Sequence, residues 1–171
     1  ILYSKPNYGD LVVFKTPSDN RTDFIKRLIG LPGDQIQFKD GNLFVNNEMI
    51  KREKINNRND IRCAGKEIDV LEYNEELSKK KSFNIVYKLK GSMKNSDLYK
   101  VPDEHFFFLG DNRDCSSDSR FKNNVGYVHK NNLVGKARII FFSNDTMKGS
   151  VLKFWNWSNS LRRDRFFKII E

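Results

Sequence analysis

Two segments of this 171-residue sequence carry residue types that could perform chemistry. The first, residues 23–34, places two cations, Lys26 and Arg27, next to each other in an apolar stretch. In a strand, alternation would give each cation apolar neighbours on its own face. Burial among such neighbours lowers the pKa of a lysine, whereas an arginine stays charged, so Lys26 could serve as a general base. Taken alone, this segment is explained more simply by a lysine that extends into water from a strand end.

The second segment, residues 110–121, is a loop dense in Gly, Asp, Asn, Ser and Arg that follows an apolar strand. Such a loop can be held together by Asx turns and by Asp–Arg pairs. Its hydroxyl groups could also orient a buried amine and so complete a polar site. By itself, the segment is equally consistent with an ordered turn that has no catalytic role.

Together the two segments closely resemble motifs of the bacterial type I signal peptidases, membrane-bound proteases that use a serine–lysine dyad. Residues 9–14 resemble the Gly-Asp-Val-Val-Val-Phe strand of that family, and residues 24–34 resemble the motif with the catalytic lysine. Residues 110–120 match Gly-Asp-Asn-Arg-Asp-x-Ser-x-Asp-Ser-Arg at every fixed position. The resemblance runs through residues 7–47 and 101–142, and the tail of the chain resembles proteobacterial members.

The resemblance implies roles for the base and for four residues around it. Lys26 would be the general base, kept neutral by its apolar surroundings. Ser116 would hydrogen-bond the lysine amine and orient it. Asp118 and Arg120 would form an ion pair that fixes the loop, and Gly110 would leave room beside the lysine.

The resemblance also implies the substrates, which are the signal peptides of exported preproteins, cleaved after small residues in an Ala-x-Ala pattern. Asp23, Phe24 and Ile25 would pair with the extended substrate by strand addition and help form its pocket for small side chains. The nucleophilic serine of the family lies in a Ser-Met-x-Pro-Thr-like motif before the first strand. We expect this nucleophile upstream of residue 1, because Ser4 is not followed by Met. Ser92 is followed by Met but comes after the lysine motif, so we do not expect it to be the nucleophile.

Short apolar runs separated by turn signals predict a mainly β fold, with antiparallel sheets forming a rolled or barrel-like catalytic core. The predicted strands are residues 11–14, 24–29, 35–38, 43–45, 106–109 and 133–142. Helix signals are confined mostly to residues 70–80 and the tail.

The sequence divides into a catalytic β core, a variable β-rich insertion and a C-terminal segment. We assign residues 1–50 and 101–150 to the core, residues 51–100 to a cap-like insertion of short strands and loops, and residues 151–171 to a basic aromatic tail. The net charge of +9 arises mainly outside the core, since the insertion contributes +5 and the tail +3. The tail either packs with a solvated basic face or lies on an anionic membrane surface.

The charge surplus also raises an alternative from another class, a basic β-domain that binds nucleic acid. We do not expect a nucleic-acid partner, because the cations form no stripe with stacking aromatic residues. A non-catalytic homologue, and relatives such as plasmid-transfer or organelle peptidases and self-cleaving repressors, also remain open. The resemblance favours a signal peptidase at the bacterial inner membrane, with its catalytic domain on the periplasmic side.

Cysteine and histidine spacing predicts no metal site and no cofactor. His105 and His129 are expected to be structural or surface residues rather than members of a Ser-His-Asp triad. For Cys63 and Cys115, two unpaired thiols are the simpler expectation, and a disulfide between them is left open. No run of apolar residues is long enough to form a membrane-spanning helix.

Overall fold

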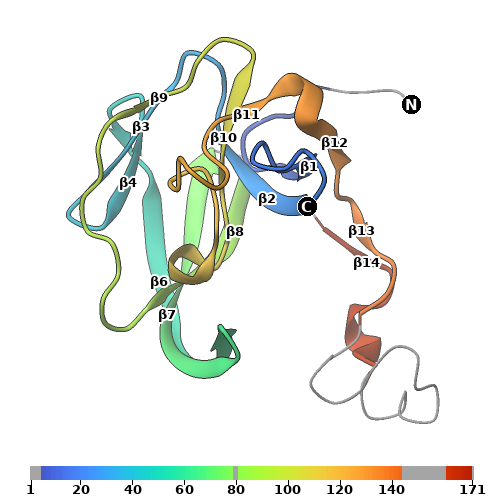
Figure 1. The fold of residues 1–171 in the computed structure, drawn as a ribbon. Coiled ribbons are helices and arrows are strands. Elements are labelled where there is room, and N and C mark those ends of the chain that lie inside the picture. The colour runs from blue at the N-terminus through green and yellow to red at the C-terminus, as the bar shows by residue number, and fades with distance from the viewer. Residues whose placement is uncertain (1–4, 79–80, 144–160, 171) are drawn as a thin grey trace. The chain divides into compact units, whose positions relative to one another are not determined.

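The structure is a computed structural model that describes residues 5–78, 81–143 and 161–170 (Figure 1). It divides into two compact units, residues 1–136 and residues 137–171. The predicted fold class is confirmed, since nearly all regular elements are antiparallel β-strands. The sheets of the described residues are antiparallel, as expected, but they do not close into a barrel.

The larger unit is built around a five-stranded sheet that carries the first motif. In spatial order its strands are β11 (Val128–His129), β10 (His105–Leu109), β2 (Asp23–Gly30), β1 (Leu11–Lys15) and β12 (Leu133–Lys136). The second half of β2 is buried; β1 pairs with one edge of the strand from Asp23 to Arg27, and β10 pairs with the other edge from Arg27 to Gly30. This sheet therefore holds the lysine motif between two neighbouring strands of the core.

A second, four-stranded sheet consists of β5 (Glu48–Met49), β4 (Asn42–Val45), β3 (Gln35–Lys39) and β9 (Tyr99–Lys100). Strands β3 and β4 form a hairpin whose turn, Asp40-Gly41, has φ angles of 50° and 79°. Positive φ at both turn positions matches the right-handed twist of the flanking strands. The Asp-Gly pair, which predicts a tight turn, thus forms the turn of a β-hairpin in the structure.

The insertion, residues 51–100, contains a three-stranded antiparallel sheet of β6 (Lys51–Cys63), β7 (Lys66–Ser78) and β8 (Lys81–Lys88). The expectation of short strands was wrong here, because β6 and β7 each have 13 residues. The helix expected over residues 70–80 was wrong as well, since β7 reaches Ser78 and pairs with both of its neighbours. Pairing along both edges of β7 outweighs the local sequence preference. Residues 79–80 lie outside the described residues.

Two hydrophobic clusters cover opposite faces of the central strands. One contains Leu28 of β2 and Phe108 of β10, and the other contains Ile29 and Phe107 of the same two strands. These four side chains are fully buried. The part of β2 that follows Lys26 is therefore fixed on both faces.

The smaller unit contains β13 (Ile139–Ile140) paired with β14 (Lys168–Ile169), and a 3₁₀ turn, η4 (Arg163–Arg165). The strand expected over residues 133–142 is divided between β12 and β13. In the described part of the tail, the helix signal corresponds only to the 3₁₀ turn. Residues 144–160, which include Trp155 and Trp157, lie outside the described residues. No helix in the described part of the chain is long and apolar enough to cross a membrane.

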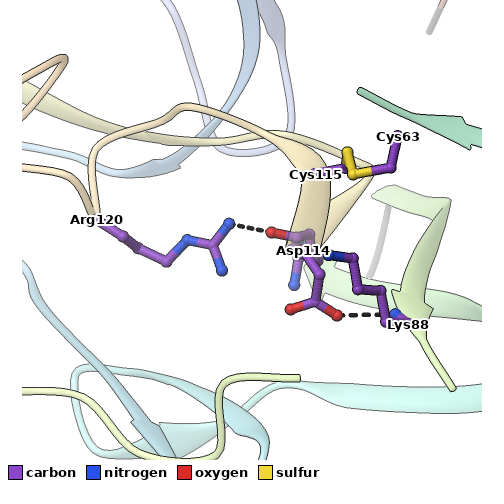
Figure 2. Close-up of a disulfide and its surroundings, with 6 residues drawn as sticks. Cys63, Lys88, Asp114, Cys115 and Arg120 are labelled. Atoms are coloured by element: carbon purple, nitrogen blue, oxygen red, sulfur yellow. Dashed lines mark hydrogen bonds between the residues drawn. A yellow bond between two sulfur atoms is a disulfide. The ribbon is translucent and has the colours of Figure 1, made fainter. Parts of the chain in front are cut away.

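The two cysteines form a disulfide, which corrects the expectation of unpaired thiols. Cys63 ends β6, and Cys115 ends a short 3₁₀ helix, η1 (Arg113–Cys115), in the second motif (Figure 2). Their Cα atoms lie 5.6 Å apart although 52 positions separate them in the sequence. Spacing alone could not reveal this pairing, because it depends on where the β6–β7 hairpin ends in space.

Candidate functional site

Lys26 extends from β2 beside Phe24, and its Nζ lies 5.1 Å from the centroid of that ring. The side chain is half-buried, and burial lowers the pKa of its amine below the ordinary lysine value. Three charges modify this effect: Asp118 raises the pKa, Arg120 lowers it and Asp111 raises it. Desolvation is the largest cause, so the amine loses its proton more readily than that of a free lysine.

Ser116 is brought to Lys26 by the pairing of β10 with β2. Leu109 at the end of β10 lies opposite Arg27, so the chain that follows β10 passes next to Lys26. Lys26 Nζ donates a hydrogen bond to Ser116 Oγ over 2.8 Å. The structure thus joins the two sequence segments through the pair of residues that the resemblance singles out.

Gly110 allows the hydroxyl of Ser116 to occupy this position. A Cβ atom at residue 110 would lie 2.0 Å from Ser116 Oγ and 2.3 Å from Ser116 Cβ, far inside any permitted contact. The absence of a side chain at Gly110 therefore leaves room for Ser116, which in turn contacts Lys26.

Asp118 and Arg120 form a buried ion pair, as the resemblance implies. Arg120 donates from Nε to Asp118 Oδ1 and from Nη2 to Asp118 Oδ2, each over 2.8 Å. Asp118 Oδ2 also accepts a hydrogen bond from the backbone N–H of Gly110 over 3.0 Å, and Arg120 donates to the carbonyl oxygen of Arg113. These bonds close residues 110–120 into one loop, hereafter the 110–120 loop.

Arg27 has a different environment from its neighbour Lys26. Its guanidinium forms a two-fold hydrogen bond with Asp111 over 2.8 and 2.7 Å and donates to the carbonyl oxygen of Gly9 over 2.7 Å. It also lies 3.9 Å from the centroid of the Phe83 ring. Arg27 therefore connects β2, the 110–120 loop and the insertion, and its charge is balanced by the carboxylate of Asp111.

Asp23, Phe24 and Ile25 lie at the start of β2, before the part that pairs with β10. Their strand pairs with β1 along one edge, and no described strand pairs with the other edge at these positions. The backbone N–H of Leu28 donates to the carbonyl oxygen of Asp10, the residue before β1, so the backbone groups of Leu28 point toward β1. Because these groups alternate in direction along a strand, those of residues 23 and 25 point to the opposite, free edge. The side chain of Ile25 is 49% exposed. An extended peptide could add to this edge as a further strand.

Comparison with known proteins connects this geometry to a family. Residues 2–142 match the sequence profile of the family described as "Signal peptidase, peptidase S26". The chain belongs to this family. It is 36% identical over 185 residues to the signal peptidase I of Rickettsia conorii and 37% identical over 181 residues to that of Rickettsia prowazekii.

These alignments cover 98% and 96% of the chain but 66% of each relative, so the chain spans just under two thirds of their length. A solved signal peptidase I from Enterococcus faecalis V583 superposes with a TM-score of 0.45 at 24% identity. That superposition covers 78% of this chain and 97% of the other.

Ser92, the other serine followed by Met, is held within the insertion. Its hydroxyl donates to the carbonyl oxygen of Lys88 over 3.2 Å and to the carboxylate of Asp114. It therefore supports the 110–120 loop from the side of the insertion. That Ser92 is not a nucleophile stays a prediction.

The two histidines face each other across β10 and β11, with ring centroids 5.0 Å apart. His129 Nε2 lies 3.5 Å from a carboxylate oxygen of Glu104. No group of three or more potential ligands is suitably placed for a metal ion among the residues that the structure describes. Both histidines are thus placed as a surface pair at the end of the sheet.

Sequence reasoning missed the partner of Arg113, a residue of the matched motif. Arg113 donates to Glu75 Oε2 over 2.8 Å and to the hydroxyl of Tyr87 over 3.0 Å, and the Arg113–Glu75 pair is only 1% exposed on either side. An arginine within a fixed motif signals that an acidic partner exists. No sequence pattern identifies Glu75, because it lies in the insertion that the motifs do not cover.

Proposed function

We propose that this chain is the catalytic body of a serine endopeptidase that removes signal peptides from exported preproteins with a Ser–Lys dyad. The observation that carries the proposal is the half-buried Lys26 amine, 2.8 Å from Ser116 Oγ, with its pKa lowered by burial. A lysine in this state can accept a proton near neutral pH, which an arginine cannot do. Lys26 is the base, and the nucleophilic serine lies upstream of residue 1.

In the proposed reaction, the hydroxyl of the upstream serine attacks the carbonyl carbon of the scissile peptide bond while the Lys26 amine takes its proton. The resulting Lys26 ammonium gives this proton to the leaving amine, and an acyl-enzyme forms. A water molecule, activated by the same amine, then hydrolyses the ester. Ser116 keeps the Lys26 amine in one orientation throughout, because its Oγ accepts a hydrogen bond from Nζ.

The substrate binds as an extended strand on the free edge of β2. The backbone groups of Asp23 and Ile25 supply the hydrogen bonds, and Phe24 and Ile25 help form the pocket for small side chains, consistent with an Ala-x-Ala preference. Support comes from the absence of a described partner strand at these positions and from the exposure of Ile25. The edge ends at Lys26, so a bound strand would bring its scissile bond to the base.

We place the enzyme at the bacterial inner membrane, with the catalytic body on the periplasmic side and in contact with anionic lipid. Support comes from the smaller unit, where apolar side chains are exposed near basic ones. The exposed apolar residues include Ile139, Phe141, Phe142, Phe167 and Ile169, and the exposed basic residues include Arg138, Arg163, Arg165 and Lys168. Apolar side chains beside cations suit the headgroup layer of a membrane.

The test is cleavage of a preprotein with an Ala-x-Ala site by the full-length protein that contains this chain. We expect Lys26→Ala and Lys26→Arg to retain at most a few per cent of the wild-type kcat, because neither side chain can supply a neutral amine. In the wild type, kcat/KM should rise with pH through a pKa below that of free lysine, since only the neutral amine accepts the proton. Lys39→Ala, at an exposed lysine of β3, is the matched control and should retain full activity.

Two results would overturn the proposal. One is substantial cleavage by the Lys26→Ala enzyme, which would remove the lysine from the mechanism. The other is a folded wild-type protein that cleaves no such preprotein, which would identify a non-catalytic homologue.

A further inference from the structure

The insertion holds the 110–120 loop at four positions that immediately precede Ser116. Each of the four attachments is made by a different residue of the insertion. The backbone carbonyl oxygen of Asp111 accepts from Val86 N–H over 2.9 Å, Arg113 pairs with Glu75, Asp114 accepts from Lys88 N–H over 2.8 Å, and Cys115 is bonded to Cys63. Figure 2 shows the last two attachments on neighbouring residues of the loop.

Ser116 itself has few constraints of its own. Among the described residues, no backbone hydrogen bond holds Ser116 or Ser117. On the other side, Ser117 Oγ accepts a hydrogen bond from the side-chain amide of Asn124 over 2.6 Å, and the carboxylate of Asp118 binds Arg120 and the backbone N–H of Gly110. The position of the Ser116 hydroxyl therefore depends on the residues on either side of it, and of its two neighbours Cys115 is the one held by a covalent bond.

The disulfide is also accessible. Cys63 directly precedes the exposed Ala64-Gly65 turn between β6 and β7, and both cysteines are only half-buried. They line an open pocket of about 830 Å³ together with Ser116. A small thiol can thus reach the bond from the pocket that borders the serine.

We propose that the Cys63–Cys115 disulfide is a positioning cross-link that holds Ser116 against Lys26, so that catalysis by this enzyme depends on its oxidation. The proposal rests on the proposed function, in which Lys26 is the base. Cys63 and Cys115 touch neither the substrate nor the reacting atoms. They act through Ser116.

Opening the bond would change the protonation of Lys26 in a defined direction. The charged groups that act on its amine, Asp111, Asp118 and Arg120, all lie on the 110–120 loop, whereas β1 presents the apolar Val12 opposite Lys26. When the loop loosens, water reaches the amine and removes part of the desolvation that lowers its pKa. The pKa of Lys26 then rises, and a smaller fraction of the base is neutral at pH 7.

The kinetic consequence is a change in kcat rather than in KM. Substrate binds on the edge of β2 formed by residues 23–25, which is paired with β1 and is not part of the loop. We expect kcat at neutral pH to fall roughly tenfold, a fraction of the effect of a whole general base. The loss should diminish at high pH, where the amine is neutral in both forms.

A dithiol such as dithiothreitol is the reagent for the first measurement. Its thiolate attacks one Sγ atom, and its second thiol then releases the other cysteine from the mixed disulfide. Two cysteine thiols and one cyclic disulfide result, so the dithiol supplies both electrons and both protons. Cys63→Ser is the genetic equivalent, and it leaves the residue next to Ser116 unchanged.

The experiment measures the pH dependence of Lys26 acylation by a trace amine reagent, read by mass spectrometry, in the folded 171-residue chain. We expect the Lys26 titration to move to higher pH after reduction and, equally, in Cys63→Ser. Ser116→Ala removes the contact that the disulfide is proposed to hold, so adding Cys63→Ser to Ser116→Ala should have little further effect on the Lys26 titration. Cys63→Ser should also lose its response to dithiothreitol.

Because this readout needs no cleavage, it remains informative if the proposed protease activity fails. In the full-length enzyme, the same changes should lower kcat at neutral pH with KM nearly constant. An unchanged Lys26 titration and an unchanged kcat, with only a lower melting temperature, would overturn the proposal and leave the disulfide as a stabilising bond. Re-oxidation of the reduced wild type should restore the original titration, which excludes irreversible unfolding.

Discussion

Lys26 and Arg27 are adjacent cations on one strand, and the fold gives them opposite surroundings. Arg27 has its charge balanced by Asp111 and satisfied by a backbone carbonyl group. Lys26 has a neutral hydroxyl as its hydrogen-bond partner and a ring beside it. The same local sequence thus places one permanently charged structural residue beside one amine that can lose its proton.

Gly110 gives the sharpest prediction at the scale of single residues. We expect Gly110→Ala to lower kcat by at least about tenfold, because the new Cβ would displace the Ser116 hydroxyl from Lys26. The matched control is Gly135→Ala in β12, where an added Cβ would meet no atom within 4 Å. Preprotein cleavage and thermal unfolding of both full-length variants check this. Wild-type activity of Gly110→Ala would show that the position of Ser116 does not matter.

The sequence identified the residues of the site but not the contacts that hold them in place. Motif matches identified Lys26, Ser116 and the Asp118–Arg120 pair, and the structure brings all four into one loop-and-strand arrangement. Their functional roles remain predictions. The disulfide could not be predicted, because the pairing of distant residues depends on tertiary structure rather than on local pattern.

At the scale of elements, the predictable strands are those bounded by turn residues. The β3–β4 hairpin follows from Asp40-Gly41, and β1 follows from its short apolar run, whose residues alternate between buried and half-buried in the structure. The insertion was misjudged because its long strands are polar and their pairing, not their composition, makes them strands. Its sheet is also more than a cap, since it supplies the partners of the 110–120 loop.

The Glu75–Arg113 pair predicts how strongly the insertion and the loop are coupled. Both side chains are buried, so Glu75→Gln would leave a buried arginine charge without its counter-ion. We expect a loss of about 3–5 kcal/mol in the free energy of unfolding, measured by urea titration. The exposed Arg62–Glu67 pair of the same hairpin provides the control, and Glu67→Gln should cost at most about 1 kcal/mol. Equal losses in the two variants would contradict the assigned importance of the buried pair.

At the scale of the whole molecule, the net charge of +9 is spread unevenly along the chain. The windows that carry the motifs are nearly neutral, and the surplus belongs to the insertion and the tail. In the smaller unit, Phe141 and Phe167 are 72% and 64% exposed and contact each other edge to face. Exposed aromatic rings beside cations are better suited to insertion between lipid headgroups than to contact with a nucleic-acid backbone.

The last prediction therefore concerns the membrane surface. We expect the 171-residue chain to co-sediment with vesicles that contain anionic phosphatidylglycerol, and less with purely zwitterionic vesicles, because each nearby cation contributes about 1 kcal/mol. Phe141→Ser and Phe167→Ser should each weaken binding by roughly tenfold, since each removes apolar area from the lipid contact. Met49→Ser, at an exposed apolar residue of β5 in the larger unit, is the control and should bind as the wild type does. Equal binding by all three variants would show that charge alone attracts the chain, and a salt-sensitive shift of DNA without vesicle binding would favour a nucleic-acid partner instead.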